Sequence, residues 1–162
     1  MNSRVCVHEV SHAIAARSVG QRVRFAKVFG DGSGACAIAW TMGDSFDWRD
    51  ALLVTVSGVI GERVMMGSAE FDRHELTRAR NWIEAIRQMT PGTLQCIVEQ
   101  APEFIEATRK ADQLLREHRG VVLQLSRKLE REHVLTGSEI EELATSRSPA
   151  VLRARIALEM NP

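Results

Sequence analysis

Two histidines near the start of the chain, His8 and His12, place the strongest constraint on its local fold. Residues four apart stand one above the other on an α-helix, so the two imidazole rings share a face if this segment is helical. Both rings can then reach a single zinc ion at about 2.0–2.1 Å. Glu9 follows the first histidine, as in the His-Glu-x-x-His pattern of zinc hydrolases, where this glutamate is the general base.

The same residues also have a simpler interpretation. An ordinary amphipathic helix with solvated or hydrogen-bonded histidines would show the same spacing. Apolar and small residues surround the histidines on both sides, and Gly20 is a suitable C-terminal stop. Either interpretation predicts a buried helix over residues 2–19. A catalytic zinc site needs a third protein ligand, which must come from elsewhere in the chain.

Candidate third ligands gather in one short segment that contains Asp72, His74 and Glu75. Asp72 and Glu75 have the spacing of a helix capping box, which would explain both carboxylates without a metal. The two roles are compatible, because Asp72 can cap the helix while Glu75 points inward. His118 and His133 lie in stretches rich in glutamate and arginine, which favours a solvated helix face for both.

The rest of the chain predicts a mainly α-helical single domain over residues 1–162, with one small β-hairpin. A chain of this length can form one well-buried core and is short for two domains. Short strand-like runs on both sides of a glycine-rich turn predict the hairpin over residues 22–40. Helical spacing predicts helices over 48–66, from Asp72 to the Thr90-Pro91-Gly92 turn, and over 103–118 and 121–132, with a short helix before Pro102.

Local signals predict details of these helices. Gly58 and Gly61 suggest a close approach of the helix over 48–66 to a neighbour. Gly120 suggests either a break between the helices over 103–118 and 121–132 or a bend in one long helix. A capping box that starts at Ser138 and ends at Glu141 predicts a further short helix. A last helix is expected from Ser148-Pro149 through Leu158, because proline suits a first helical turn.

Composition excludes several classes of partner. The formal net charge is zero and the pI is near 7.0, which gives no electrostatic basis for binding nucleic acid. The most apolar stretch, Ala51 to Met66, is interrupted by glycines and charges, so we expect no membrane span. The three cysteines are scattered and form no CxxC pair, and the chain shows no signal peptide at its start, which together favour the cytoplasm.

Four segments, in order, resemble the peptidase domain of FtsH-type ATP-dependent zinc metalloproteases along most of the chain. Residues 8–14 (HEVSHAI) are similar to that family's HEAGHA-type motif, and a hairpin with a glycine-rich turn follows. Residues 56–67 (VSGVIGERVMMG) are similar to its next helix, and residues 75–79 (ELTRA) to its DLxxAT segment. Residues 114–119 (LLREHR) and 129–140 (LEREHVLTGSEI) resemble the end of that domain.

The resemblance implies a helical zincin-like fold and a zinc ion held by His8, His12 and Glu75, with Glu9 as general base. Two departures bear on the site: Ser11 replaces the family's glycine, and Glu75 stands where the family has aspartate. The loop before Glu75 also differs, so Asp72 or His74 stays open as the third ligand.

The activity that the resemblance implies is zinc metalloendopeptidase activity on unfolded or short polypeptides. The sequence contains no G-x-x-x-x-G-K-[ST] loop for ATP, so we expect a free-standing peptidase that depends on a separate ATPase for folded substrates. The family assembles as hexamers, which leaves a homo-oligomer open.

Two rival functions belong to other classes. A helical protein-interaction module could keep the zinc site for stability, or could have lost it, and would use Trp40, Trp48 and Trp82 as anchors if these side chains are not in the core. A zinc hydrolase of a non-peptide amide would use the same ligands.

Overall fold

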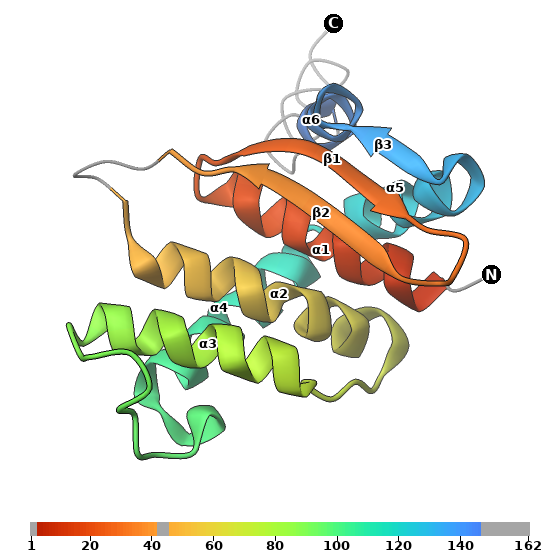
Figure 1. Cartoon of the computed structure of the whole chain (residues 1–162). Coiled ribbons are helices and arrows are strands. Elements are labelled where there is room, and N and C mark those ends of the chain that lie inside the picture. Colours follow the sequence, from red (N-terminus) through yellow and green to blue (C-terminus); the bar gives the residue numbers. More distant parts are fainter. Residues whose placement is uncertain (1–2, 42–45, 147–162) are drawn as a thin grey trace, which may run out of the picture.

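The structure is a computed structural model that describes residues 3–41 and 46–146 (Figure 1). Helices dominate it, as predicted, with a small antiparallel sheet at one side. The elements are, in order, α1 (Ser3–Ser18), β1 (Arg22–Val28), β2 (Gly34–Ala39), α2 (Trp48–Met66), α3 (Arg73–Ile86), the 3₁₀ turn η1 (Val98–Gln100), α4 (Pro102–Glu117), α5 (Arg119–Glu132), β3 (Val134–Thr136) and α6 (Gly137–Ser146).

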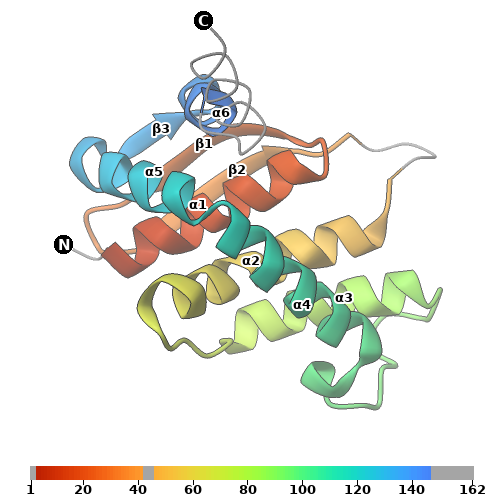
Figure 2. The ribbon, with the colours of Figure 1, turned by 180° about the vertical axis from the view of Figure 1, so that it is seen from behind.

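Helix α1 lies at the centre of the fold. The sheet covers one side of α1, and α2 packs on the other side. Behind them, α5 packs on α1 and α4 packs on α2 (Figures 1 and 2). Val10, Ala13 and Ala16 on α1 are completely buried, and their small size lets neighbouring elements approach closely. The predicted buried helix is therefore confirmed over the residues described.

The predicted close approach involving Gly58 and Gly61 is confirmed, and the neighbour is α1. A Cβ atom on Gly61 would overlap the hydroxyl of Ser11 and lie 2.6 Å from Ser11 Cβ. Such a distance is shorter than any ordinary contact between carbon atoms, so a side chain at position 61 would push the two helices apart.

The sheet has the strand order β2-β1-β3, with both pairs antiparallel. The hairpin of β1 and β2 was predicted, and its turn holds Gly32 at φ +85° and Asp31, which accepts hydrogen bonds from Ser33. Strand β3 was not predicted. It has only three residues and begins directly after the left-handed C-cap of α5, so it carries little periodic signal of its own.

Caps define the ends of α2 and α3. Asp47 accepts a hydrogen bond from the backbone N–H of Arg49, and Gly67 ends α2 in the left-handed conformation. Asp72 and Glu75 form the predicted capping box at the start of α3, in which each side chain binds the other residue's backbone N–H. These caps satisfy backbone groups at the helix ends, and the apolar face of each helix packs in the core.

Two predicted boundaries are wrong. The break between α4 and α5 falls at His118, and Gly120 lies inside the first turn of α5. The capping box of α6 pairs Thr136 with Glu139, because Thr136 Oγ1 accepts from the Glu139 N–H at 3.3 Å and Glu139 accepts from the Thr136 N–H at 2.8 Å. Glu141 instead binds an arginine on α1.

The helix predicted from Ser148 through Leu158 lies outside the described residues. None of the described helices combines the length and the apolar character needed to cross a bilayer.

Candidate functional site

The two histidines of α1 point at a glycine on α2. A Cβ atom built on Gly58 would overlap Nε2 of His8 and stand 2.6 Å from Nε2 of His12. Both nitrogens therefore converge on one small space, which exists only because residue 58 has no side chain. As predicted, His8 and His12 share one face of α1. That face lies against Gly58 of α2, where a methyl group would fill the space between the two rings.

The other nitrogen of each ring is held by α2. Nδ1 of His12 lies 2.6 Å from the carbonyl oxygen of Val54, and Nδ1 of His8 lies 2.7 Å from Glu62 Oε1. Each acceptor requires a hydrogen on Nδ1, which fixes the tautomer and leaves the Nε2 lone pair available. Val54, Gly58 and Glu62 are four residues apart, so one face of α2 orients both rings and leaves room between them.

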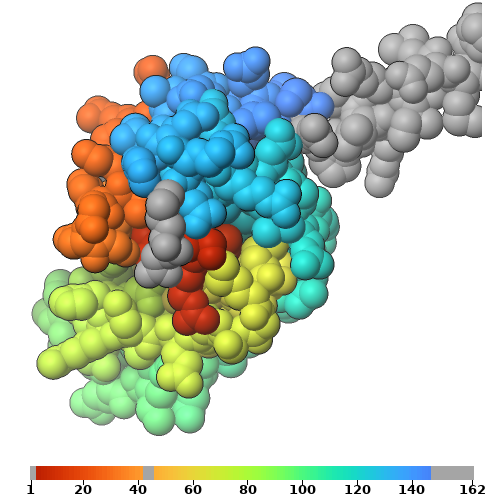
Figure 3. Space-filling view, turned by 90° about the vertical axis from the view of Figure 1, so that its right-hand side faces the viewer, coloured from red at the N-terminus to blue at the C-terminus, as the bar shows by residue number. Residues whose placement is uncertain are grey.

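Glu62 is a site residue that the sequence analysis did not identify. It is 8% exposed, and its second oxygen lies 3.2 Å from Nε of Arg4. Arg4 belongs to the first turn of α1, which meets the end of α2 at the surface (Figure 3). One signal was present: an acidic residue one turn after Gly58, on an otherwise apolar helix face.

Glu75 divides its two oxygens between two roles. Oε2 accepts the N–H of Asp72 in the capping box, and Oε1 points toward His8, 3.4 Å from its Nε2. Oε1 is buried and has no hydrogen-bond partner among the described residues. The capping box and the inward orientation therefore occur together, on the same side chain.

These distances suit a divalent cation. Ligand atoms that surround zinc tetrahedrally at about 2.0–2.1 Å stand about 3.3 Å apart, close to the separation of His8 Nε2 and Glu75 Oε1. Two lone-pair acceptors at that distance repel each other unless a proton or a metal cation lies between them. Within residues 3–41 and 46–146, no three His, Cys, Asp or Glu side chains already form a complete metal cluster. Two pairs of side chains have a spacing that suits zinc: His8 with His12, and His8 with Glu75.

The other candidate ligands lie elsewhere. Asp72 and His74 are both exposed at the start of α3, and the Asp72 carboxylate accepts the N–H of Glu75. His118 separates α4 from α5, and His133 caps α5 in the left-handed conformation. None of these four residues forms an ion pair with His8, as Glu75 does, and none lines the pocket that contains His8.

Glu9 lies beside the histidines under the start of β2. It is 7% exposed, and a Cβ atom on Gly34 would approach its Oε1 to 2.7 Å. Burial raises the pKa of Glu9, while the nearby positive charges of His8 and Arg78 oppose that shift. A carboxylate with a raised pKa is better suited to accept and release a proton near neutral pH.

The two histidines have opposite electrostatic surroundings. Burial lowers the pKa of His12 to about 3, so its ring stays neutral and its Nε2 lone pair stays free. Burial also opposes protonation of His8, but its hydrogen bond to Glu62 and the charges of Glu9 and Glu75 outweigh this effect and raise its pKa. The three carboxylates around His8 favour a cation at this position.

His8, Glu9 and His12 open into a pocket of about 430 Å³. One wall is strand β2, which lies at one edge of the sheet in the described part of the chain (Figure 1). The opposite wall comes from α2 and α3. The pocket is lined by His8, Glu9, His12, Gly34, Ala35, Cys36, Ile38, Trp40, Val54, Thr55, Arg78 and Trp82.

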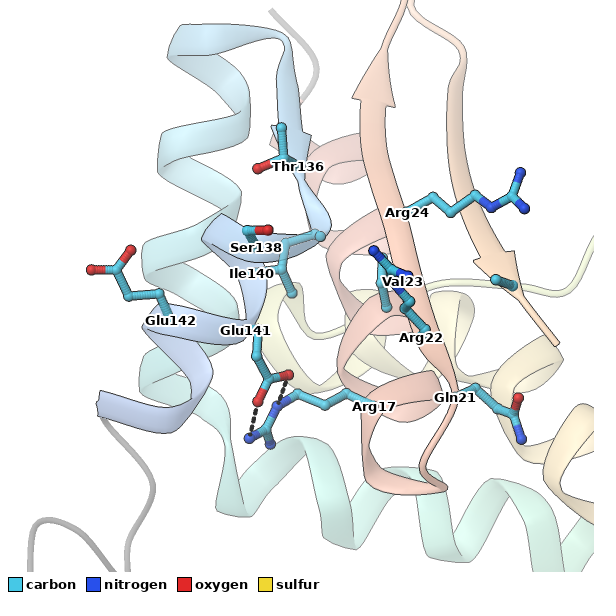
Figure 4. A pocket seen from close by; sticks show the side chains of 12 residues that line it. Arg17, Gln21, Arg22, Val23, Arg24, Thr136, Ser138, Ile140, Glu141 and Glu142 are labelled. Atoms are coloured by element: carbon cyan, nitrogen blue, oxygen red, sulfur yellow. Dashed lines mark hydrogen bonds and ion pairs between the residues drawn. The ribbon is translucent and has the colours of Figure 1, made fainter. Parts of the chain in front are cut away.

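A larger hollow of about 820 Å³ lies between the end of α1, β1 and α6 (Figure 4). The ion pair of Arg17 with Glu141 crosses it, with Nε and Oε2 2.7 Å apart. It is lined by exposed arginines and glutamates and by no histidine or cysteine. The smaller pocket is therefore the one that contains the candidate metal ligands His8 and His12.

Removal of Glu62 tests whether its hydrogen bond to Nδ1 of His8 contributes to zinc binding. We expect Glu62→Ala to weaken zinc binding about 10–100-fold, because His8 loses the acceptor that fixes its tautomer and orientation. Glu62→Gln should lose less, since its amide oxygen can still accept from Nδ1. Zinc competition with a chromophoric chelator measures both variants. Equal affinity in the alanine variant and the wild type would contradict this role.

Comparison with known proteins assigns no family to the chain. Neither models of known protein families nor curated proteins match it. The resemblance to FtsH-type peptidases remains a prediction from the sequence, and the site geometry carries the functional argument.

Proposed function

We propose that this protein is a zinc-dependent metallopeptidase that hydrolyses peptide bonds of unfolded or short polypeptides. The convergence of His8 Nε2 and His12 Nε2 above Gly58 is the observation that supports the proposal most strongly. Hydrogen bonds hold both rings in the tautomer that a metal requires. A helix whose histidines merely contact solvent would need neither arrangement.

In this proposal His8, His12 and Glu75 would hold the zinc ion. When bound, zinc would supply Lewis-acid polarisation of a carbonyl oxygen and would lower the pKa of a water toward about 7. Glu9 accepts the proton of the attacking water and returns it to the leaving amine. Its burial beside His8 places it next to the proposed metal position, and its raised pKa favours both transfers.

Strand β2 would align the substrate. Its outer edge runs along the pocket that contains His8 and Glu9, so an extended peptide could add to the sheet there through backbone hydrogen bonds. This mode suits unfolded segments and excludes folded proteins. Folded substrates would depend on a separate ATPase or on an assembly of several copies.

The three cysteines are free thiols, and burial raises the pKa of Cys36 to about 12, so its reactive thiolate form is suppressed. We propose the cytoplasm, a compartment in which free cysteines such as these three stay reduced.

Glu9→Gln is the direct test of the proposed function. We expect it to lower kcat for unfolded casein about 10²–10⁴-fold, because general-base catalysis is lost, while one zinc per chain is retained. Metal content by atomic absorption and cleavage by gel electrophoresis provide the two measurements. Glu142→Gln, which changes an exposed glutamate on α6, is the matched control and should keep full activity.

The possible results separate the rival functions. A wild type that holds zinc but cleaves no polypeptide would favour the catalytically silent interaction module or a non-peptide amide hydrolase. A wild type that holds no zinc would exclude the peptidase and leave only the interaction module.

A further inference from the structure

All three tryptophans of the chain lie in one aromatic cluster. Its members are Trp40, Phe46, Trp48 and Trp82, called the aromatic wall below. Consecutive members are in contact: Trp40 with Phe46 at 5.6 Å between ring centroids, Phe46 with Trp48 at 4.8 Å, and Trp48 stacked on Trp82 at 5.6 Å. The wall joins the end of β2 to the start of α2 and to α3.

None of these four side chains belongs to the fully buried core. Each is half-buried, so the chain exposes part of four large aromatic rings on one surface. Trp82 is also held in place, because its Nε1 donates a hydrogen bond to Thr55 Oγ1 at 2.9 Å. Rigid, partly exposed aromatic rings are typical of binding surfaces.

Two members of the wall line the pocket described above. Trp40 and Trp82 line the same cavity as His8, Glu9 and His12. Ile38 lies in the same lining and adds apolar surface beside the two rings. A pocket that combines a few polar groups with aromatic rings suits a ligand that has both polar and apolar parts.

Strand β2 sets the distance between Glu9 and the wall. Gly34 contacts Glu9, and Trp40 stands six residues further along the chain, which is about 20 Å in an extended strand. A polypeptide segment on the outer edge of β2 would therefore extend from the catalytic glutamate to the wall over at most about six residues.

We propose that the aromatic wall makes the pocket selective for extended polypeptide segments that carry a large aromatic or apolar side chain within about six residues of the cleaved bond. The part of this inference that concerns cleavage rests on the proposed peptidase function. The part that concerns binding does not, because the wall and the edge of β2 are present whatever the chemistry.

Binding is tested with two peptides of about ten residues that differ only in phenylalanine or glycine at one position. The Glu9→Gln protein prevents turnover during the measurement. Because every tryptophan lies in the wall, intrinsic fluorescence reports directly on its occupancy. We expect the phenylalanine peptide to bind about 10-fold or more tightly and to change the emission, and Trp82→Ala to remove the difference.

Two further variants keep this test decisive. Trp40→Ala changes the wall without touching α3, and it replaces Trp82→Ala if that variant does not fold. Phe29→Ala removes an exposed aromatic ring in the hairpin turn, away from the pocket, and should keep the 10-fold difference. Equal affinities for the two peptides, or a difference that survives both tryptophan variants, would overturn the inference.

Cleavage with zinc-loaded wild type separates the two proposals. A kcat/KM about 10-fold or more higher for the phenylalanine peptide supports both. Cleavage of both peptides at equal rates overturns the selectivity and leaves the peptidase function in place. No cleavage of either peptide, together with tight binding of the phenylalanine peptide, overturns the peptidase function and supports the wall as a binding site.

Discussion

Gly58→Ala should abolish zinc binding and leave the fold intact. The new methyl group would occupy the space where the two Nε2 atoms converge. The atoms it meets are the far ends of two side chains, so the rings can rotate away without moving either helix. That rotation breaks the hydrogen bonds to Val54 and Glu62 and separates the nitrogens. Metal content should fall from about one zinc per chain to background, and peptidase activity should fall with it.

Two other glycines provide controls for this change. Gly120→Ala lies in open space within α5 and should keep the zinc content, with about 0.4–1 kcal/mol of added stability. Gly61→Ala, one turn from Gly58, meets Ser11 near the backbone of α1, so it should instead destabilise the fold by about 1–3 kcal/mol. Full zinc binding by Gly58→Ala would show that the space above Gly58 is not the metal position.

The elements that the sequence predicted well carry their own boundary signals. Helix α2 has Asp47 before it and Gly67 after it, and both act locally on the backbone. Helix α3 likewise begins with the capping box of Asp72 and Glu75. Helix caps of this kind can be predicted from a single sequence, because only neighbouring residues form them.

The errors arose where distant segments decide the structure. Strand β3 exists because β1 offers an edge, with Lys27 opposite Val134. Thr136 rather than Ser138 caps α6, because the chain leaves the sheet at that residue. Gly120 was expected to mark a break or a bend, but a glycine inside a helix costs only about 1 kcal/mol, and the break falls two residues earlier, at His118.

In the site, too, the features set by neighbouring residues were predicted, and those set by distant segments were not. The motif placed His8, Glu9 and His12 together because its spacing is helical. The acceptors at Val54 and Glu62 were not predicted, because they depend on the packing of α2 against α1. Gly58 was recognised as a point of close approach, but the sequence did not show that the approaching groups are the two histidines.

Glu75→Gln should lower zinc affinity by more than the 10–100-fold that is typical of an outer hydrogen-bond partner. The amide oxygen can still accept the N–H of Asp72, so the start of α3 should persist, while the negative charge beside His8 is lost. Competition with a chelator measures the affinity, and thermal unfolding monitored by circular dichroism checks that the fold is intact.

The neighbouring candidates complete this test of the third ligand. Asp72→Ala removes the N-cap and should cost about 1 kcal/mol of stability with zinc retained, and His74→Ala should change neither property. Loss of zinc in only one of these two variants would refute Glu75 as the ligand. Zinc retention in all three would mean that a proton on His8, rather than a metal, satisfies the buried Glu75 oxygen. Loss of zinc in Glu75→Gln alone would tie the unpartnered Oε1 to the metal, because the other oxygen is already engaged in the capping box.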